Sequence, residues 1–155
     1  MDQVRETLDD RGQKLLTTWC SVDGDLKPCV VELVARLHER NSHGPMFEPD
    51  ASLLDLRHPN IVSYLGFVET DTYYGIAAER LLGKSLREEL DLQIAAKTHL
   101  PEDIIISWLK QLVEGLHFLH EENAASHGNL DASQVLLVGD GTIKIQGYGF
   151  PRSKY

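Results

Sequence analysis

Four residues in the first third of the chain are of the types that bind metal ions: Cys20, Cys29, His38 and His43. Paired cysteines in structural zinc sites are usually separated by about two to four residues, and the gaps here are wider. We therefore expect no zinc site. Two cysteines do not make a disulfide framework, and the opening residues lack the pattern of a secretory signal, so we expect two free thiols.

A second group of polar residues lies later in the chain, where His127, Asn129 and Gln134 stand close together in the sequence. Histidine can act as a general acid or base near neutral pH. The amides of asparagine and glutamine donate and accept hydrogen bonds but do not take up a proton. Asn129 therefore cannot serve as a carboxylate base, whereas Gln134 still offers an amide oxygen.

The composition limits the class of protein. The 155 residues are 42% hydrophobic and 25% charged, which excludes collagen, coiled coils and wholesale disorder. The net charge is −9, so nucleic acids and anionic membranes, which bind cationic surfaces, are not expected partners. No apolar run approaches the roughly 20 residues that span a membrane. We expect a cytoplasmic protein, with the nucleus as the alternative compartment.

The first half of the chain has the pattern of a sheet. Short apolar and β-branched runs predict strands at residues 15–20, 29–34, 61–68 and 73–79. The Asp-Gly step at residues 23–24 favours a hairpin between the first two strands. Residues 38–49 are predicted to form a loop, and residues 51–56 a short helix that ends before Pro59.

The second half begins with helical signals. Ser85 and Glu88 have the spacing of a capping box, which predicts a helix that starts at Ser85. The strongest helix covers residues 101–121, because Pro101 suits the first helical position and apolar residues recur at helical spacing. Residues 135–138 and 142–145 are predicted strands joined by a Gly-Asp-Gly turn. This order predicts an α+β fold, in which an antiparallel sheet lobe precedes a helical lobe.

Five segments, in matching order and spacing, resemble eukaryotic protein kinases. Residues 56–62 (Leu-Arg-His-Pro-Asn-Ile-Val) resemble the junction after the regulatory helix, and residues 79–86 resemble the hinge and the start of the first large-lobe helix. Residues 112–120 are similar to the long helix before the catalytic loop. Residues 127–137 (His-Gly-Asn-Leu-Asp-Ala-Ser-Gln-Val-Leu-Leu) stand where the family has His-Arg-Asp-Leu-Lys-Pro-x-Asn-x-Leu-Leu, and residues 143–149 occupy the Asp-Phe-Gly strand.

The resemblance implies one partial kinase-like domain over residues 1–155, with the sheet lobe at about 10–79 and the beginning of the helical lobe at 80–155. If the chain ends at Tyr155, the apolar face of the helix at residues 101–121 lacks the large-lobe helices that cover it in the family. We therefore expect an exposed apolar patch on this helix, which marks an interface or a tendency to aggregate.

In the sheet lobe, the resemblance implies that Glu32 replaces the lysine that grips the nucleotide phosphates. A carboxylate there would repel the triphosphate. The glutamate that orients this lysine falls at Pro49, and no Gly-x-Gly-x-x-Gly precedes the second predicted strand. Ala78 and Glu79 fall, with Gln134, in the family's adenine pocket, which implies at most a vestigial pocket.

In the catalytic loop, the resemblance implies that the catalytic aspartate is Asn129, the magnesium-binding asparagine is Gln134, and the metal-binding aspartate is Gly147. His127 falls at a position that packs structurally in the family. Asn129 and Gln134 form either an unusual catalytic pair or relaxed, formerly catalytic positions. We favour the second interpretation, because the base and the metal ligand are lost together.

The resemblance and its departures together predict a pseudokinase that serves as a regulatory or scaffolding module and uses no ATP, magnesium or other metal cofactor. The expected partners are other proteins, and an active kinase domain in the same or another chain is one candidate. Two alternatives remain: a divergent active Ser/Thr kinase that binds ATP, and a non-autonomous fragment of a larger kinase-family protein. Residues 56–65 and 140–145 are also loosely similar to the degenerate domain beside the active kinase in the amino-acid-starvation translation kinases.

Overall fold

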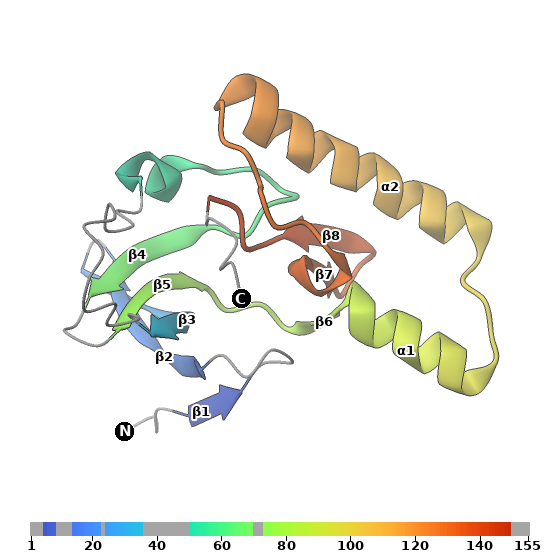
Figure 1. The fold of residues 1–155 in the computed structure, drawn as a ribbon, viewed down its shortest axis with the longest axis horizontal. Coiled ribbons are helices and arrows are strands. Elements are labelled where there is room, and N and C mark those ends of the chain that lie inside the picture. The colour runs from blue at the N-terminus through green and yellow to red at the C-terminus, as the bar shows by residue number, and fades with distance from the viewer. Residues whose placement is uncertain (1–4, 9–13, 23, 36–49, 70–72, 150–155) are drawn as a thin grey trace, which may run out of the picture. The chain divides into compact units, whose positions relative to one another are not determined.

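A computed structural model describes residues 5–8, 14–22, 24–35, 50–69 and 73–149 (Figure 1). The chain divides into two compact units. Unit 1 comprises residues 1–56 and 63–80, and unit 2 comprises residues 57–62 and 81–155. The short segment 57–62 thus belongs to unit 2, although the residues on both sides of it in the sequence belong to unit 1.

Unit 1 is built on a five-stranded antiparallel sheet in the order β1-β2-β3-β5-β4. Its strands are β1 (Arg5–Leu8), β2 (Lys14–Val22), β3 (Asp25–Ala35), β4 (Tyr64–Glu69) and β5 (Tyr73–Glu79). A 3₁₀ turn, η1 (Ala51–Asp55), precedes β4. Cys29, Val31 and Ala77 form a buried cluster on β3 and β5. In the strand order, β3 is the central strand of the sheet, with β2 on one side and β5 on the other.

Cys29 is disulfide-bonded, so the expectation of a free thiol is wrong for this residue. The chain has one other cysteine, Cys20. In the β2–β3 register Cys29 pairs with Thr18 and Cys20 pairs with Lys27, which makes the two cysteines diagonal neighbours on adjacent strands. The sequence argument relied on the number of cysteines and on the expected compartment, and it did not consider this register.

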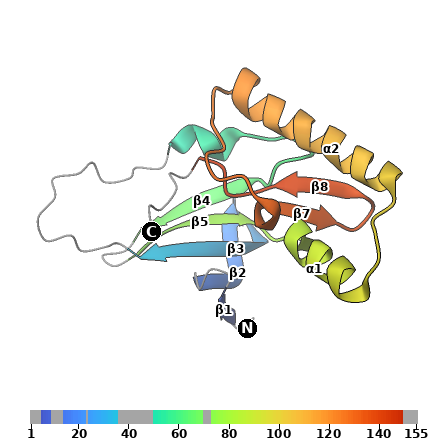
Figure 2. The same ribbon diagram turned by 45° about the vertical axis from the view of Figure 1, so that its right-hand side comes forward.

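Unit 2 combines a three-stranded antiparallel sheet, in the order β6-β7-β8, with two helices (Figure 2). The strands are β6 (Gly83–Ser85), β7 (Val135–Val138) and β8 (Thr142–Ile145). The helices are α1 (Leu86–Ala96) and α2 (Glu102–His117). A π-helical turn, η2 (Phe118–Glu122), extends α2, and a 3₁₀ turn, η3 (Ala132–Gln134), leads into β7.

The segment 57–62 is held to β8 and α2 by a buried polar group. Asn60 donates from Nδ2 to the Gln111 side chain and to the Ile143 carbonyl, both at 3.0 Å. The Gln111 Oε1 also accepts from the Ile143 backbone N at 2.9 Å. Ile61 forms a parallel bridge with Ile145. Asn60 therefore ties a loop, a helix and a strand together inside unit 2.

Most of the predicted elements are confirmed. The strands at residues 73–79, 135–138 and 142–145 have the predicted bounds, and the helix predicted at residues 101–121 is α2 continued by η2, with Pro101 at the N-cap. The capping box is present, since Ser85 and Glu88 exchange hydrogen bonds. The strand predicted at residues 61–68 is β4 in the structure, and it begins later than predicted, at Tyr64. The predicted loop at residues 38–49 lies outside the described residues.

The surface of unit 2 leaves part of α2 exposed. Ile105, Leu109 and Val113 form one stripe of this helix, with 40%, 55% and 62% of their surfaces accessible.

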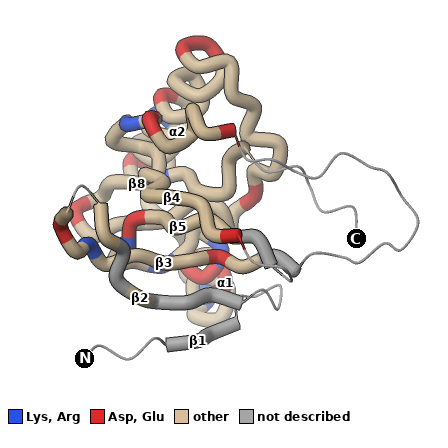
Figure 3. Tube along the Cα trace, turned by 90° about the vertical axis from the view of Figure 1, so that its left-hand side faces the viewer, with Lys and Arg blue, Asp and Glu red and all other residues tan. Residues whose placement is uncertain are grey.

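Acidic residues are more frequent than basic ones along the described chain (Figure 3). Among the described residues, no helix is both long enough and apolar enough to cross a membrane.

Candidate functional site

Glu32 lies on the central strand of unit 1. It pairs with Leu15 of β2 and with Ile76 of β5, and its side chain is partly buried. The neighbouring residues Val31 and Ile76 are buried. The structure therefore holds a carboxylate in the middle of the sheet, at the position where the kinase resemblance expects a lysine.

Ala78 and Glu79 lie at the end of β5. In the register Ala78 pairs with Val30 on one side and with Tyr64 on the other. The Glu79 carboxylate accepts a hydrogen bond from the Ser63 backbone N at 3.0 Å, and the Glu79 backbone N donates to the Ser63 carbonyl at 2.9 Å. The side chain and the backbone of Glu79 thus both hold Ser63, the residue just before β4. Pro49, the remaining sheet-lobe candidate, lies outside the described residues.

The helical-lobe candidates His127, Asn129, Gln134 and Gly147 lie in unit 2. Gln146 accepts a hydrogen bond from one of them and donates one to another, and we call these five residues the motif cluster. His127 is 2% exposed. Its Nε2 lies 2.8 Å from the Gln146 carbonyl, and its Nδ1 accepts from the Asn129 backbone N at 3.2 Å. These partners fit a neutral ring that carries its proton on Nε2, because a carbonyl accepts and a backbone N–H donates.

The His127 ring is therefore a link between the loop at residue 129 and the segment after β8. Burial lowers the pKa of His127, the nearby His120 lowers it further, and the hydrogen bond to Gln146 and the charge of Asp131 act in the opposite direction. Burial has the largest effect, so the ring stays neutral in the folded protein at pH values where an exposed histidine begins to gain a proton.

We expect the free energy of unfolding to decrease as the pH falls below about 6.5, the ordinary histidine pKa. In that range the unfolded chain binds the proton before the folded chain does, and the loss continues until the pH passes the lowered folded-state pKa of His127. Urea unfolding between about pH 8 and pH 5 measures this slope. A His127→Gln variant removes this contribution and should show a flatter profile; identical slopes would contradict the prediction.

Gln134 and Gly147 lie against each other. The Gln134 backbone N donates to the Asp131 carbonyl at 3.0 Å, and the Gln146 backbone N donates to the Gln134 carbonyl at 2.9 Å. Gly147 has a φ of +75°, and a Cβ placed on it would lie 2.2 Å from Gln134 Oε1. A side chain at position 147 therefore requires the Gln134 side chain to move and also adopts a backbone conformation that favours glycine.

Tyr148 was not among the sequence candidates. It is fully buried, and its hydroxyl donates to the Val62 carbonyl at 2.6 Å. The signal that could have found it is its place after Gly147, where the kinase family has phenylalanine. A tyrosine hydroxyl at a buried position requires a hydrogen-bond partner, and segment 57–62 supplies it.

The motif cluster is thus a neutral group. Asn129, Gln134 and Gln146 contribute amides, and Gly147 contributes no side chain. Asp131 is the N-cap of η3, where its carboxylate accepts from the Ser133 backbone N at 2.7 Å. Within the described ranges, no three His, Cys, Asp or Glu side chains gather in a way that could hold a metal ion. The geometry orders the backbone of the loop and presents amide groups rather than carboxylates.

Comparison with known proteins decides the family. Residues 36–154, more than half of the chain, match the protein kinase domain. The chain belongs to the protein kinase domain family. This kinase-family chain has the α+β architecture expected from its sequence, with an antiparallel sheet followed by helices.

Several curated protein kinases are similar to this kinase-family chain. The mitogen-activated protein kinase kinase kinase MST11 of Pyricularia oryzae is 37% identical over 100 residues, which cover 64% of this chain and 10% of that protein. Mitogen-activated protein kinase kinase kinase 2 of Arabidopsis thaliana is 32% identical over 116 residues, covering 74% of this chain and 17% of that protein. The human lymphokine-activated killer T-cell-originated protein kinase is 34% identical over 112 residues, covering 70% and 35%. The matched region thus spans between a tenth and about a third of these relatives.

Proposed function

We propose that this chain is a catalytically inactive kinase-like domain that acts as a regulatory or scaffolding module for other proteins, with an active kinase domain in the same or another chain as one candidate partner. The observation that carries the first half of this proposal is the contact between Gln134 and Gly147. The side chain of one former motif position fills the space beside the other, where the family holds its metal-binding aspartate.

A magnesium–nucleotide complex does not fit the residues of the motif cluster. Magnesium in phosphoryl-transfer sites is held by carboxylates together with phosphate oxygens. Gly147 has no ligand atom, and a carboxylate-bearing side chain at this position would have its Cβ 2.2 Å from Gln134 Oε1. The amide of Asn129 cannot take the proton of a substrate hydroxyl. We therefore derive no phosphoryl-transfer step for this chain.

The sheet supports the same conclusion. Glu32 places a partly buried carboxylate on the central strand. Two negative charges about 4 Å apart repel by roughly 4 kcal/mol at an intermediate dielectric, so a triphosphate beside Glu32 would be repelled. The loss of attraction for phosphate and the loss of a metal ligand act in the same direction, against nucleotide binding.

The second half of the proposal, binding to proteins, is supported by the exposed stripe of α2. Ile105, Leu109 and Val113 are between 40% and 62% accessible. Exposed apolar side chains that adjoin one another on one face of a helix form a contiguous patch, and such a patch marks an interaction surface. The acidic net charge of −9 favours protein partners over nucleic acids.

The alternative is a divergent active kinase, and the observation in its favour is the naming of the relatives as protein kinases. In this alternative Gln134 would contribute an amide oxygen to a nucleotide-bound cation. Its side chain would then turn away from Gly147, which it now approaches closely.

We expect millimolar Mg·ATP to leave the melting temperature unchanged and to transfer no phosphate. A ligand that binds the folded state raises stability in proportion to the logarithm of its concentration over Kd, so an absent shift at millimolar ATP means that binding is weaker than millimolar. The measurement is a thermal-shift titration with ATP, with and without magnesium, beside a radiolabelled transfer assay on generic protein substrates.

Two variants decide between the readings. A magnesium-dependent shift that disappears in Gln134→Ala would show nucleotide binding, and phosphate transfer that disappears in Asn129→Ala would overturn the proposal. Restoring Glu32→Lys, Asn129→Asp and Gly147→Asp together should not create activity, because the base, the metal ligand and the phosphate clamp act as a unit. Adding Gln134→Asn to this set shortens the side chain beside Gly147 and gives the restoration its best geometric chance.

A further inference from the structure

The exposed stripe of α2 lies on the side of the helix that faces away from the strands of unit 2. Ile105, Leu109 and Val113 stand four residues apart, a spacing that places side chains on one face of a helix. Gln111 lies on nearly the opposite side, and its Oε1 accepts a hydrogen bond from the Ile143 backbone N of β8 at 2.9 Å. The stripe is therefore separate from the face with which α2 contacts β8.

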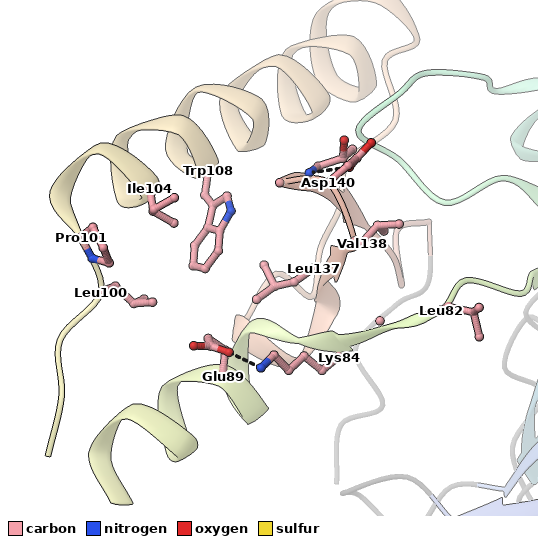
Figure 4. Close-up of a pocket in the computed structure, with 14 residues that line it drawn as sticks. Leu82, Lys84, Glu89, Leu100, Pro101, Ile104, Trp108, Leu137, Val138 and Asp140 are labelled. Carbon is pink, nitrogen blue, oxygen red and sulfur yellow. Dashed lines mark hydrogen bonds and ion pairs between the residues drawn. The ribbon is translucent and has the colours of Figure 1, made fainter. Parts of the chain in front are cut away.

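Other apolar residues of α2 are used inside unit 2. Ile104 and Trp108 lie one turn apart and point toward Leu137 of β7 (Figure 4). Gly115 is buried against β8, since a Cβ placed on it would lie 2.9 Å from Ile145 Cδ1. A helix that is apolar around most of its circumference is normally covered on all sides. The stripe therefore favours a partner of its own.

The apolar pattern around the stripe is the same in both directions from Leu109. Ile105 and Val113 stand four positions before and after it, and Ile106 and Leu112 stand three positions before and after it. A two-fold axis between two copies brings the same patch of each copy together. With Leu109 on the axis of an antiparallel helix pair, Ile105 of each copy faces Val113 of the other. The pattern is therefore complementary to itself.

The charges at the two ends of α2 favour the antiparallel arrangement. The first turn contains Glu102 and Asp103, and the last turn contains His117. In an antiparallel pair centred on Leu109, the first turn of one helix lies beside the last turn of the other, where an imidazole N–H can donate to a carboxylate. A parallel pair would place the carboxylates of both copies together, where like charges repel each other.

The stripe also lies in a part of this acidic chain that has no acidic residue. The net charge of −9 opposes the association of two copies. Residues 104–113, however, contain neither Asp nor Glu, and Lys110 is their one charged residue. Lys110 is exposed, so it faces solvent beside the stripe. Two copies that meet along this segment therefore bring none of its side chains into acidic repulsion.

We propose that two copies of this chain pair through α2, as an antiparallel helix pair with its two-fold axis at Leu109. The proposal rests on the protein-binding half of the proposed function and names the partner of the stripe. The contact runs from residue 105 to residue 113, roughly 12 Å along each helix at 1.5 Å per residue. Small interfaces, below about 1,200 Å², are typical of weak complexes, so we expect the dimer to dissociate at micromolar concentrations.

The test is sedimentation velocity of the full chain over a wide range of micromolar concentrations. We expect the mass to rise from that of one chain toward that of two. Leu109→Glu places two carboxylates on the axis and should weaken the dimer at least about tenfold. Leu92→Glu on α1 is its control, because Leu92 and Leu109 are both 55% exposed. The mass of one chain at every concentration, or equal effects of the two variants, would overturn the proposal.

Three double variants at Ile105 and Val113 test the antiparallel register. Ile105→Lys with Val113→Glu places opposite charges at both facing pairs, whereas two lysines or two glutamates at these positions place like charges there. We expect the variant with opposite charges to dimerise at least about tenfold more tightly than either of the others. The variant with two lysines controls for net charge, because it makes the chain less acidic. If it dimerises as tightly as the variant with opposite charges, the antiparallel pair is wrong.

This experiment fails separately from the tests of the proposed function. A chain that stays monomeric and transfers no phosphate retains the inactive assignment and loses the dimer. A chain that stays monomeric but binds another protein through the stripe retains the protein-binding half and also loses the dimer. A chain that dimerises through α2 and transfers phosphate retains the dimer and loses the inactive assignment.

Discussion

Gly83→Ala is expected to destabilise unit 2 by about 3 kcal/mol, the upper range for forcing extra atoms into a packed site. A Cβ on Gly83 would lie 2.2 Å from the Leu137 carbonyl oxygen and 3.1 Å from its carbonyl carbon. These are backbone atoms of the neighbouring strand, which no side-chain rotation can remove. The alanine therefore forces β6 away from β7, and the three register pairs of β6 weaken together.

Thermal unfolding followed by circular dichroism measures this effect, which corresponds to a decrease in the melting temperature of roughly 10 °C. Gly139→Ala is the matched control, because a Cβ there meets no described atom within 4 Å. We expect the control to change stability by less than about 0.5 kcal/mol. If the two alanine variants have the same melting temperature, the contact between β6 and β7 is not as close as the structure places it.

Asn60→Ala is expected to cost about 2–3 kcal/mol, because it leaves buried groups without hydrogen-bond partners. Asn60 is 4% exposed, and its Nδ2 donates to the Ile143 carbonyl and to Gln111. Gln111 in turn donates from Nε2 to the Gly141 carbonyl at 2.9 Å. Loss of the Asn60 amide therefore disturbs the contact of α2 with β8 as well as the segment 57–62.

Asn123→Ala provides the comparison. Asn123 also donates from Nδ2 to a backbone carbonyl, that of Phe118 at 2.7 Å, but this hydrogen bond is exposed. Water replaces an exposed partner, so the cost should stay below about 1 kcal/mol. Urea unfolding of both variants measures the difference, and equal losses would show that burial of Asn60 does not set its contribution.

Local patterns were sufficient to predict several elements. Strand β5 and the β7–β8 hairpin have the bounds that apolar runs and the Gly-Asp-Gly turn indicate, and Gly141 adopts the positive φ that such a turn requires. The Ser85–Glu88 capping box was also readable, because both partners lie within one helical turn. In each case the residues that decide the structure are close in sequence.

Strand β6 could not be predicted in the same way. Its three residues, Gly-Lys-Ser, have low strand propensity, and they form a strand because β7, about fifty residues later in the sequence, offers them an edge. The disulfide of Cys29 likewise depends on the β2–β3 register. The local sequence specifies neither which strand pairs with β6 nor the register between β2 and β3.

In the motif cluster, too, the residue types could be read from the sequence, whereas the contacts between them could not. The residue types at Asn129 and Gly147 were visible in the sequence, and the chemistry that they lack followed from their functional groups. The approach of Gln134 to Gly147 and the hydrogen bond from Tyr148 to Val62 were not visible. The second of these joins residues 86 positions apart, and no local pattern specifies such a pair.

The assignment of residues 57–62 to unit 2 has a consequence for the order of folding. These residues are synthesised after residues 1–56 of unit 1, yet their partners Ile143, Ile145 and Tyr148 emerge much later. Contacts between residues so distant in sequence close a long loop, which raises the contact order and slows folding. The amide of Asn60 and the apolar side chains of Ile61 and Val62 therefore stay without their partners in the nascent chain until β8 is synthesised, some 80 residues later. Cleavage of the chain between residues 80 and 81 would place the segment 57–62 and β8 on two different fragments.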